Sequence, residues 1–123
     1  MHRPVHFEFH CTDLARDREF YSKVFGWKFT KYEGGKEEYW LATTGEPGET
    51  GINGGMMKSP DGQPRTINSI SVASVDASAT KILAAGGKQI MPKMTIPGVG
   101  FVAYFTDPGG LCFGIFQEDR SAR

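Results

Sequence analysis

The sequence has few of the features that mark exported, membrane-bound or nucleic-acid-binding proteins. Its two cysteines, Cys11 and Cys112, are too few for a disulfide framework. No run of about 18 apolar residues is present, so we expect no membrane-spanning helix. The first residues lack the apolar core of a secretory signal, and we therefore expect a cytoplasmic protein with reduced thiols. The 14 basic and 14 acidic residues cancel, which argues against binding to nucleic acid or to an acidic membrane.

Histidine is also scarce, yet two of the three histidines lie in one short stretch. Residues 5–11 alternate between apolar and other side chains, which predicts a β-strand with two different faces. One face carries His6, Glu8 and His10, and the other is apolar. Two histidines and a glutamate on one face predict a site that binds a metal or transfers a proton.

Turn and cap residues divide the chain into two halves of similar order. The first half predicts a strand at 5–11, a helix at 14–25 that begins after Asp13 and ends at Gly26, and strands at 27–32, 38–43 and 51–57. The apolar stripe expected on this helix consists of Leu14, Phe20, Tyr21, Val24 and Phe25. The second half predicts a strand at 66–74, a helix capped by Asp76 or Ser74 and ending at Gly86-Gly87, and strands at 88–95, 100–106 and 111–117. We therefore expect an α+β fold of two βαβββ modules, about 4–57 and 66–117, in one domain of residues 1–123.

The spacing of Gly26 and Gly87 gives an offset of 61 residues between the modules. This offset aligns the three polar residues of the first strand with Ile67, Ser69 and Ser71. We expect the modules to form one cupped mixed sheet, with the helices on its outer face and a ligand pocket on its concave face. On the last strand, alternation directs Phe113 and Ile115 toward the helix, and Cys112, Gly114 and Phe116 toward the pocket.

Two motifs lie on this duplicated frame. The first is Asp13-Leu14 followed by Phe20-Tyr21-Ser22-Lys23-Val24-Phe25-Gly26-Trp27, and the second is Tyr104-Phe105-Thr106-Asp107-Pro108-Gly109-Gly110 before a final apolar strand. With these motifs the chain resembles the vicinal oxygen chelate superfamily of glyoxalase I, bleomycin resistance proteins and extradiol dioxygenases, and especially the small bacterial glyoxalase-like proteins. The resemblance implies the duplicated fold, a homodimer, and a divalent metal that holds two neighbouring oxygens of a substrate.

The resemblance also implies one metal ligand on each of four strands, and this sequence matches one of them. His6, seven residues before Asp13, matches the first ligand. The other three positions carry Ile67, Asn53 and Gly114, and glycine has no side chain with which to bind a metal. The usual ligand set is therefore incomplete, and the binding of Zn, Ni, Fe or Mn stays open.

Strand geometry limits what the three polar residues can do together. Side chains two positions apart lie about 6.6 Å apart and can share an ion, whereas those four positions apart, at about 13 Å, cannot. A metal would therefore bind one pair, and we predict His6 and Glu8 as its ligands. Without a metal, we predict Glu8 as a general base and His10 as its catalytic partner, because burial raises a carboxylate's pKa toward the working range. A simple paired Glu8 and histidine is the alternative.

Four other side chains supply the predicted substrate contacts: Trp40, Tyr104, Cys112 and Phe116. Two classes of function remain open. The first is a glyoxalase-like enzyme, a lyase or a related activity, acting on a small oxygen-rich or carbonyl-containing molecule. The second is a non-catalytic protein of the bleomycin-resistance type that sequesters an aromatic or antibiotic-like molecule. An extradiol dioxygenase ranks third, because its iron site needs ligands on three strands.

Overall fold

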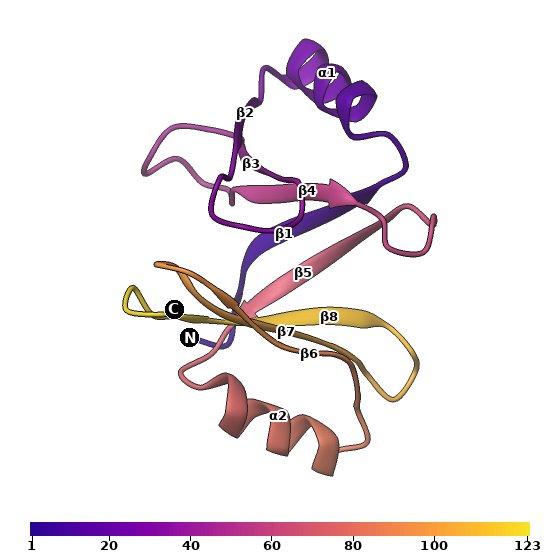
Figure 1. Cartoon of the computed structure of the whole chain (residues 1–123), viewed down its shortest axis with the longest axis vertical. Helices are drawn as coiled ribbons and strands as arrows, with labels where there is room; N and C mark the ends of the chain where they lie inside the picture. The colour runs from indigo at the N-terminus through magenta and orange to yellow at the C-terminus, as the bar shows by residue number, and fades with distance from the viewer. The chain divides into compact units, whose positions relative to one another are not determined.

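The structure, a computed structural model, describes all residues from 1 to 123 and contains two βαβββ modules (Figure 1). The first module comprises β1 (Pro4–Cys11), α1 (Leu14–Phe25), β2 (Lys28–Lys31), β3 (Tyr39–Thr43) and β4 (Gly54–Lys58). The second comprises β5 (Arg65–Ser71), α2 (Val75–Ala84), β6 (Lys88–Ile96), β7 (Gly100–Thr106) and β8 (Cys112–Glu118). The predicted α+β class and the predicted order of elements are confirmed. Neither helix has the length and apolar character that crossing a membrane requires.

The chain divides into two compact units near the boundary between the modules. One unit is Val5–Ile67, and the other is Asn68–Arg123 together with Met1–Pro4. In the first unit the strand order is β2-β3-β4-β1, with β1 parallel to β4 and the other pairs antiparallel. In the second the order is β5-β8-β7-β6, with β5 parallel to β8. The four strands of each module thus have the same mixed connectivity.

Side-chain caps fix where each helix begins. The Asp13 carboxylate accepts a hydrogen bond from the backbone N–H of Arg16 at 3.1 Å, as expected for an N-cap. Helix α1 ends at Gly26, whose φ of 75° is a left-handed conformation that glycine adopts without strain. Of the two caps predicted for α2, Ser74 is correct, because its hydroxyl accepts from the N–H of Ala77 at 3.1 Å.

An aromatic cluster holds α1 against its own sheet. The rings of Phe9 and Tyr21 lie 5.3 Å apart, and the rings of Tyr21 and Trp27 lie 4.9 Å apart. Phe7 joins the cluster from the same face of β1, with its ring 4.8 Å from that of Phe9. Because side chains on a strand alternate between faces, this packing directs the polar residues of β1 away from α1.

The sequence predicts the apolar face of α1 only in part. Tyr21 is half-buried, but Phe20, Val24 and Phe25 are 54%, 54% and 62% exposed. The half-buried positions of the helix are Leu14, Asp17, Arg18 and Tyr21, which follow a 3.6-residue period. The predicted stripe through Phe20, Val24 and Phe25 is wrong because these residues lie on the outward-facing side of the helix.

The second module packs α2 on a mainly aliphatic core. Its buried members are Val72, Val75, Ala103, Phe105 and Ile115, and partly buried Ala79 and Ile82 of α2 pack against them. Phe113 also packs against this core. The predicted direction of Phe113 and Ile115 toward the helix is therefore confirmed.

Candidate functional site

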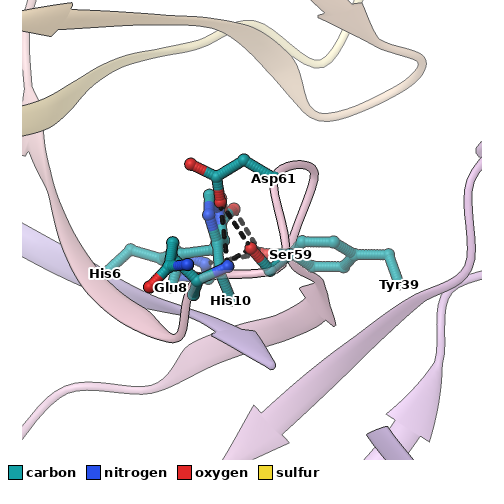
Figure 2. Close-up of polar contacts among 7 residues, drawn as sticks. His6, Glu8, His10, Tyr39, Ser59 and Asp61 are labelled. Carbon is teal, nitrogen blue, oxygen red and sulfur yellow. Dashed lines mark hydrogen bonds and ion pairs between the residues drawn. The ribbon is translucent and has the colours of Figure 1, made fainter. Parts of the chain in front are cut away.

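The polar face of β1 carries a buried carboxylate–imidazole pair. Glu8 is 4% exposed and His10 is 7% exposed. The Nε2 atom of His10 lies 2.9 Å from Oε1 of Glu8. Figure 2 draws both side chains on β1. Positions two apart on one strand face bring these side chains together, as the sequence predicts for this pair.

Tyr39 of β3 extends the pair into a chain of four side chains. Its hydroxyl donates to Oε2 of Glu8 at 3.1 Å, and Nε2 of His6 lies 3.0 Å from the same hydroxyl oxygen. A phenol has one proton, so the tyrosine oxygen that donates to Glu8 must accept from the histidine N–H. In Figure 2 the Tyr39 ring reaches toward the side chains of β1. We call His6, Glu8, His10 and Tyr39 the β1 network.

Gly55 provides the space through which Tyr39 reaches Glu8. On β4, Gly55 pairs with Glu8 of β1 on one side and with Leu41 of β3 on the other. A Cβ at Gly55 would overlap the Tyr39 hydroxyl. The glycine therefore lets the tyrosine ring lie across the middle strand of three. On the opposite face of β4, Gly54 makes room for the ring of Phe7.

Burial sets the protonation of Tyr39 and His6 in the β1 network. Burial, reinforced by the charge of Glu8 and by its hydrogen bond, raises the pKa of Tyr39 far above its usual value. The phenol therefore stays protonated and keeps donating. Burial lowers the pKa of His6 below 6.5, and the Glu8 charge opposes this shift only in part. His6 is thus neutral at neutral pH, and its one N–H is on the Nε2 atom that donates to Tyr39.

One nitrogen of the β1 network has no hydrogen-bond partner. The Nδ1 atom of His10 is buried and unpaired, while Nε2 of the same ring is bonded to Glu8. Buried polar atoms without partners are uncommon in folded proteins, because leaving one unpaired costs about 1–3 kcal/mol.

The residues present do not fit a divalent metal. No group of three or more His, Cys, Asp or Glu side chains is placed to hold one ion together. The predicted ligands His6 and Glu8 are instead joined through the hydroxyl of Tyr39, which binds both. The carbonyl oxygen of the Asn53 side chain accepts from the backbone N–H of Thr44 at 2.9 Å and so serves the loop before β4. We therefore derive no step through a metal.

None of the four predicted substrate-contact residues belongs to the β1 network. Trp40 is next to Tyr39 on β3 and hence on the opposite face, where the guanidinium of Arg18 from α1 lies 3.7 Å from its ring centroid. Tyr104, Cys112 and Phe116 belong to the second module, where the Tyr104 ring borders Gly114. Their roles in substrate binding stay predictions.

Both cysteines are free thiols. Burial, together with the charge and hydrogen bond of Asp17, raises the pKa of Cys11 to about 12. The thiol of Cys11 is therefore protonated near neutral pH and is a poor nucleophile. Cys112 is only half-buried, at the start of β8.

Tyr39 is the site residue that the sequence did not reveal. Alternation in residues 38–43 places Tyr39 and Trp40 on opposite faces of one strand, but it does not say which face meets Glu8. The signal lay in the packing of a tyrosine ring over a glycine of the neighbouring strand. That packing becomes visible only once the register of β3 on β4 is known.

Comparisons with known proteins agree with this fold. A family model described as the "Glyoxalase/Bleomycin resistance protein/Dioxygenase superfamily" matches residues 3–115. The Mycobacterium tuberculosis protein named "Putative glyoxylase CFP32" is 32% identical over 112 residues, which are 89% of this chain. The matched part is 43% of that relative, so this chain spans less than half of its length.

Two solved structures share the architecture. Methylmalonyl-CoA epimerase from Mycobacterium tuberculosis superposes with a TM-score of 0.70 at 15% identity, covering 94% of this chain and 87% of that one. The Mn(II)-bound glyoxalase from Novosphingobium aromaticivorans gives a TM-score of 0.63 at 19% identity, covering 95% of this chain and 38% of that one. At these identities the likeness concerns the fold alone.

Proposed function

Because the chain belongs to the glyoxalase/bleomycin resistance protein/dioxygenase superfamily, we propose that it acts on a small carbonyl-containing molecule by proton transfer at the Glu8–His10 pair. The observation that carries this proposal is the burial of a hydrogen-bonded carboxylate and imidazole on one strand. Buried titratable groups held by a specific partner are candidate sites of proton transfer.

The energetics of burial support a functional role for this pair. A buried carboxylate–imidazole pair contributes little net stability, because the cost of removing the carboxylate from water offsets much of what its hydrogen bond provides. The aligned positions of the second module hold Ser69 and Ser71 in β5, which has no such pair. The fold can thus be built without the pair, and we attribute its presence to chemistry.

Hydrogen exchange with solvent tests the proposal directly. Methylglyoxal, pyruvate and dihydroxyacetone each carry a hydrogen on a carbon next to a carbonyl, and its replacement by deuterium in D₂O can be followed by ¹H NMR. We expect the wild-type protein to accelerate exchange for at least one of them. Glu8→Gln should lower that rate by about 10²- to 10⁴-fold, the usual range for general acid–base catalysis.

The matched control is Glu19→Gln, a carboxylate lost from the exposed surface of α1. It should leave the exchange rate unchanged. Equal rates for the wild type and Glu8→Gln would reject proton transfer at this pair.

A non-catalytic binding protein is the second candidate, favoured by how completely the β1 network bonds to itself. Both Glu8 oxygens, the Tyr39 hydroxyl and Nε2 of His6 are already paired. A protein that only binds would be stabilised by its ligand irrespective of the Glu8 charge. Thermal shift with bleomycin as the probe should then be equal for the wild type and Glu8→Gln, with no exchange activity in either.

A further inference from the structure

We infer that Nδ1 of His10 is the atom that accepts the proton from the ligand, and that Glu8 is a positioning residue that acts through His10. This inference rests on the proposed function and deepens it. The ligand class that fits is a small carbonyl compound with an acidic hydrogen on the carbon next to the carbonyl.

The bonding of the β1 network leaves one atom available. Glu8 accepts from Tyr39 on one oxygen and binds His10 on the other. Tyr39 in turn lies within hydrogen-bond distance of His6. Only Nδ1 of His10 is buried without a partner among the polar atoms of these four side chains. A group that must accept a proton from a ligand needs such an unused position.

The chemistry of the pair identifies which nitrogen of a neutral His10 imidazole carries its one proton. An ionised carboxylate can only accept hydrogen bonds, so Nε2 of His10 carries the proton that it donates to Glu8. A neutral imidazole has one N–H, and Nδ1 therefore has a free lone pair. The partner of that lone pair must present a hydrogen, which excludes a ligand group that only accepts.

The carboxylate itself is a poor candidate for the base. Both of its oxygens are engaged, and the raised pKa of Tyr39 keeps one of those hydrogen bonds in place. In hydrolases with a carboxylate–imidazole pair, the imidazole is the base. The carboxylate orients the ring and stabilises the imidazolium. In this chain the roles of the two ring nitrogens are reversed relative to those hydrolases. Nε2 binds the carboxylate, and Nδ1 is left for the ligand.

The proton-transfer step balances without another reactant. The Nδ1 lone pair takes the hydrogen from the carbon next to the carbonyl, and the C–H electron pair forms a C=C bond. The carbonyl π pair moves to oxygen, which gives an enolate. The imidazolium of His10 is then paired with the carboxylate of Glu8. Return of a proton or a deuteron from His10 to carbon restores the carbonyl and the neutral ring.

The tautomer of His10 can be measured without any ligand. The chain has only three histidines, so two-bond ¹H–¹⁵N spectra of ¹⁵N-labelled protein give one pattern for each ring, and His10→Gln assigns that of His10. We expect a protonated Nε2 and an unprotonated Nδ1. A proton on Nδ1 of neutral His10 would overturn the inference.

Two variants separate positioning from simple structural support. In Glu8→Gln, the side-chain amide can either donate to or accept from Nε2, so His10 should lose its single tautomer. Tyr39→Phe leaves the Glu8–His10 bond intact and should keep the wild-type tautomer. A His10 tautomer that is unchanged in Glu8→Gln would remove the positioning role of Glu8.

The exchange assay completes the test. His10→Gln should lower the exchange rate of the reactive probe by at least about 10²-fold, and the exposed control His2→Gln should not change it. Exchange that survives in His10→Gln but not in Glu8→Gln would overturn the inference and leave Glu8 as the base. Absence of exchange in the wild type would reject the proposed function, while the tautomer of His10 still decides the assignment of Nδ1.

Discussion

The two modules share one fold but differ on the opening strand of each. β1 carries His6, Glu8 and His10 on its polar face, whereas the aligned positions of β5 are Ile67, Ser69 and Ser71. The middle members, Glu8 and Ser69, are both buried, at 4% and 3% exposed. The same βαβββ frame therefore accepts either a carboxylate–imidazole pair or small and apolar side chains. The polar residues of β1 are thus not required for the βαβββ fold.

The modules also differ in how each helix is held. In the first module α1 contacts the sheet through aromatic rings, including Tyr21 and Trp27. In the second module α2 rests on a mainly aliphatic core around Phe105, which is fully buried. One side of α1, with Phe20 and Val24, stays exposed. The second helix therefore covers its sheet with more of its apolar side chains than the first.

The largest expected effect distinguishes the buried core from the exposed helix face. Phe105→Ala should lower the free energy of unfolding by about 3–5 kcal/mol, because it leaves a cavity in a close-packed core. Phe20→Ala, at a side chain 54% exposed, should cost less than about 1 kcal/mol. Denaturant unfolding of both variants measures this difference. Equal losses would show that the outer face of α1 is covered in solution.

The next effect concerns the space under Tyr39. Gly55→Ala should cost about 1–3 kcal/mol, because the new methyl group must displace a ring held by hydrogen bonds. Gly109→Ala is the control, since its methyl group would meet only a carboxylate oxygen of Asp107 at 3.5 Å. Chemical denaturation compares the two variants. A Gly55 variant as stable as the Gly109 variant would contradict the packing of Tyr39 across β4.

An effect of similar size isolates the hydroxyl of Tyr39. Tyr39→Phe should cost about 1–3 kcal/mol, because it removes the partner of both Glu8 and His6 while leaving the ring in place. Tyr21→Phe keeps the aromatic packing of the first module and should change stability by less than about 0.5 kcal/mol. Thermal or chemical unfolding measures both variants. Equal losses of stability would mean that the Tyr39 hydroxyl does not hold Glu8 and His6 in the folded protein.

The smallest effect is a pH dependence specific to His6. Its pKa in the folded chain lies below the ordinary 6.5, so the unfolded chain takes up a proton first as the pH falls. The contribution of His6 therefore lowers stability progressively below about pH 6.5 and vanishes above it. His6→Gln should flatten this part of the stability curve, and His2→Gln should not. Parallel curves for the wild type and His6→Gln would show that burial does not shift His6.

Local patterns in the sequence predicted most of the fold. Alternation in β1 assigns Glu8 and His10 to one face, and caps such as Asp13 and Gly26 place the helix ends correctly. These signals depend on neighbours within a few residues. The same periodicity gave the wrong side of α1 for Phe20, because an aromatic residue on the exposed face looks like a core residue in sequence.

The contacts of the site could be predicted only in part. The Glu8–His10 pair follows from spacing on one strand, but the role of Tyr39 depends on the register of three strands. A hydrogen bond between residues 31 positions apart leaves no local pattern. The freedom of Nδ1 likewise depends on what surrounds the ring, which no periodicity describes.

The placement of the two tryptophans allows fluorescence to follow one module by itself. Both of them, Trp27 and Trp40, belong to the first module, and the second module has none. Tryptophan emission therefore reports on the first module alone, whereas far-ultraviolet circular dichroism records both. Coincidence of the two signals during denaturation would mark the duplicated chain as a single cooperative unit. A lag between them would mark two halves that melt one after the other.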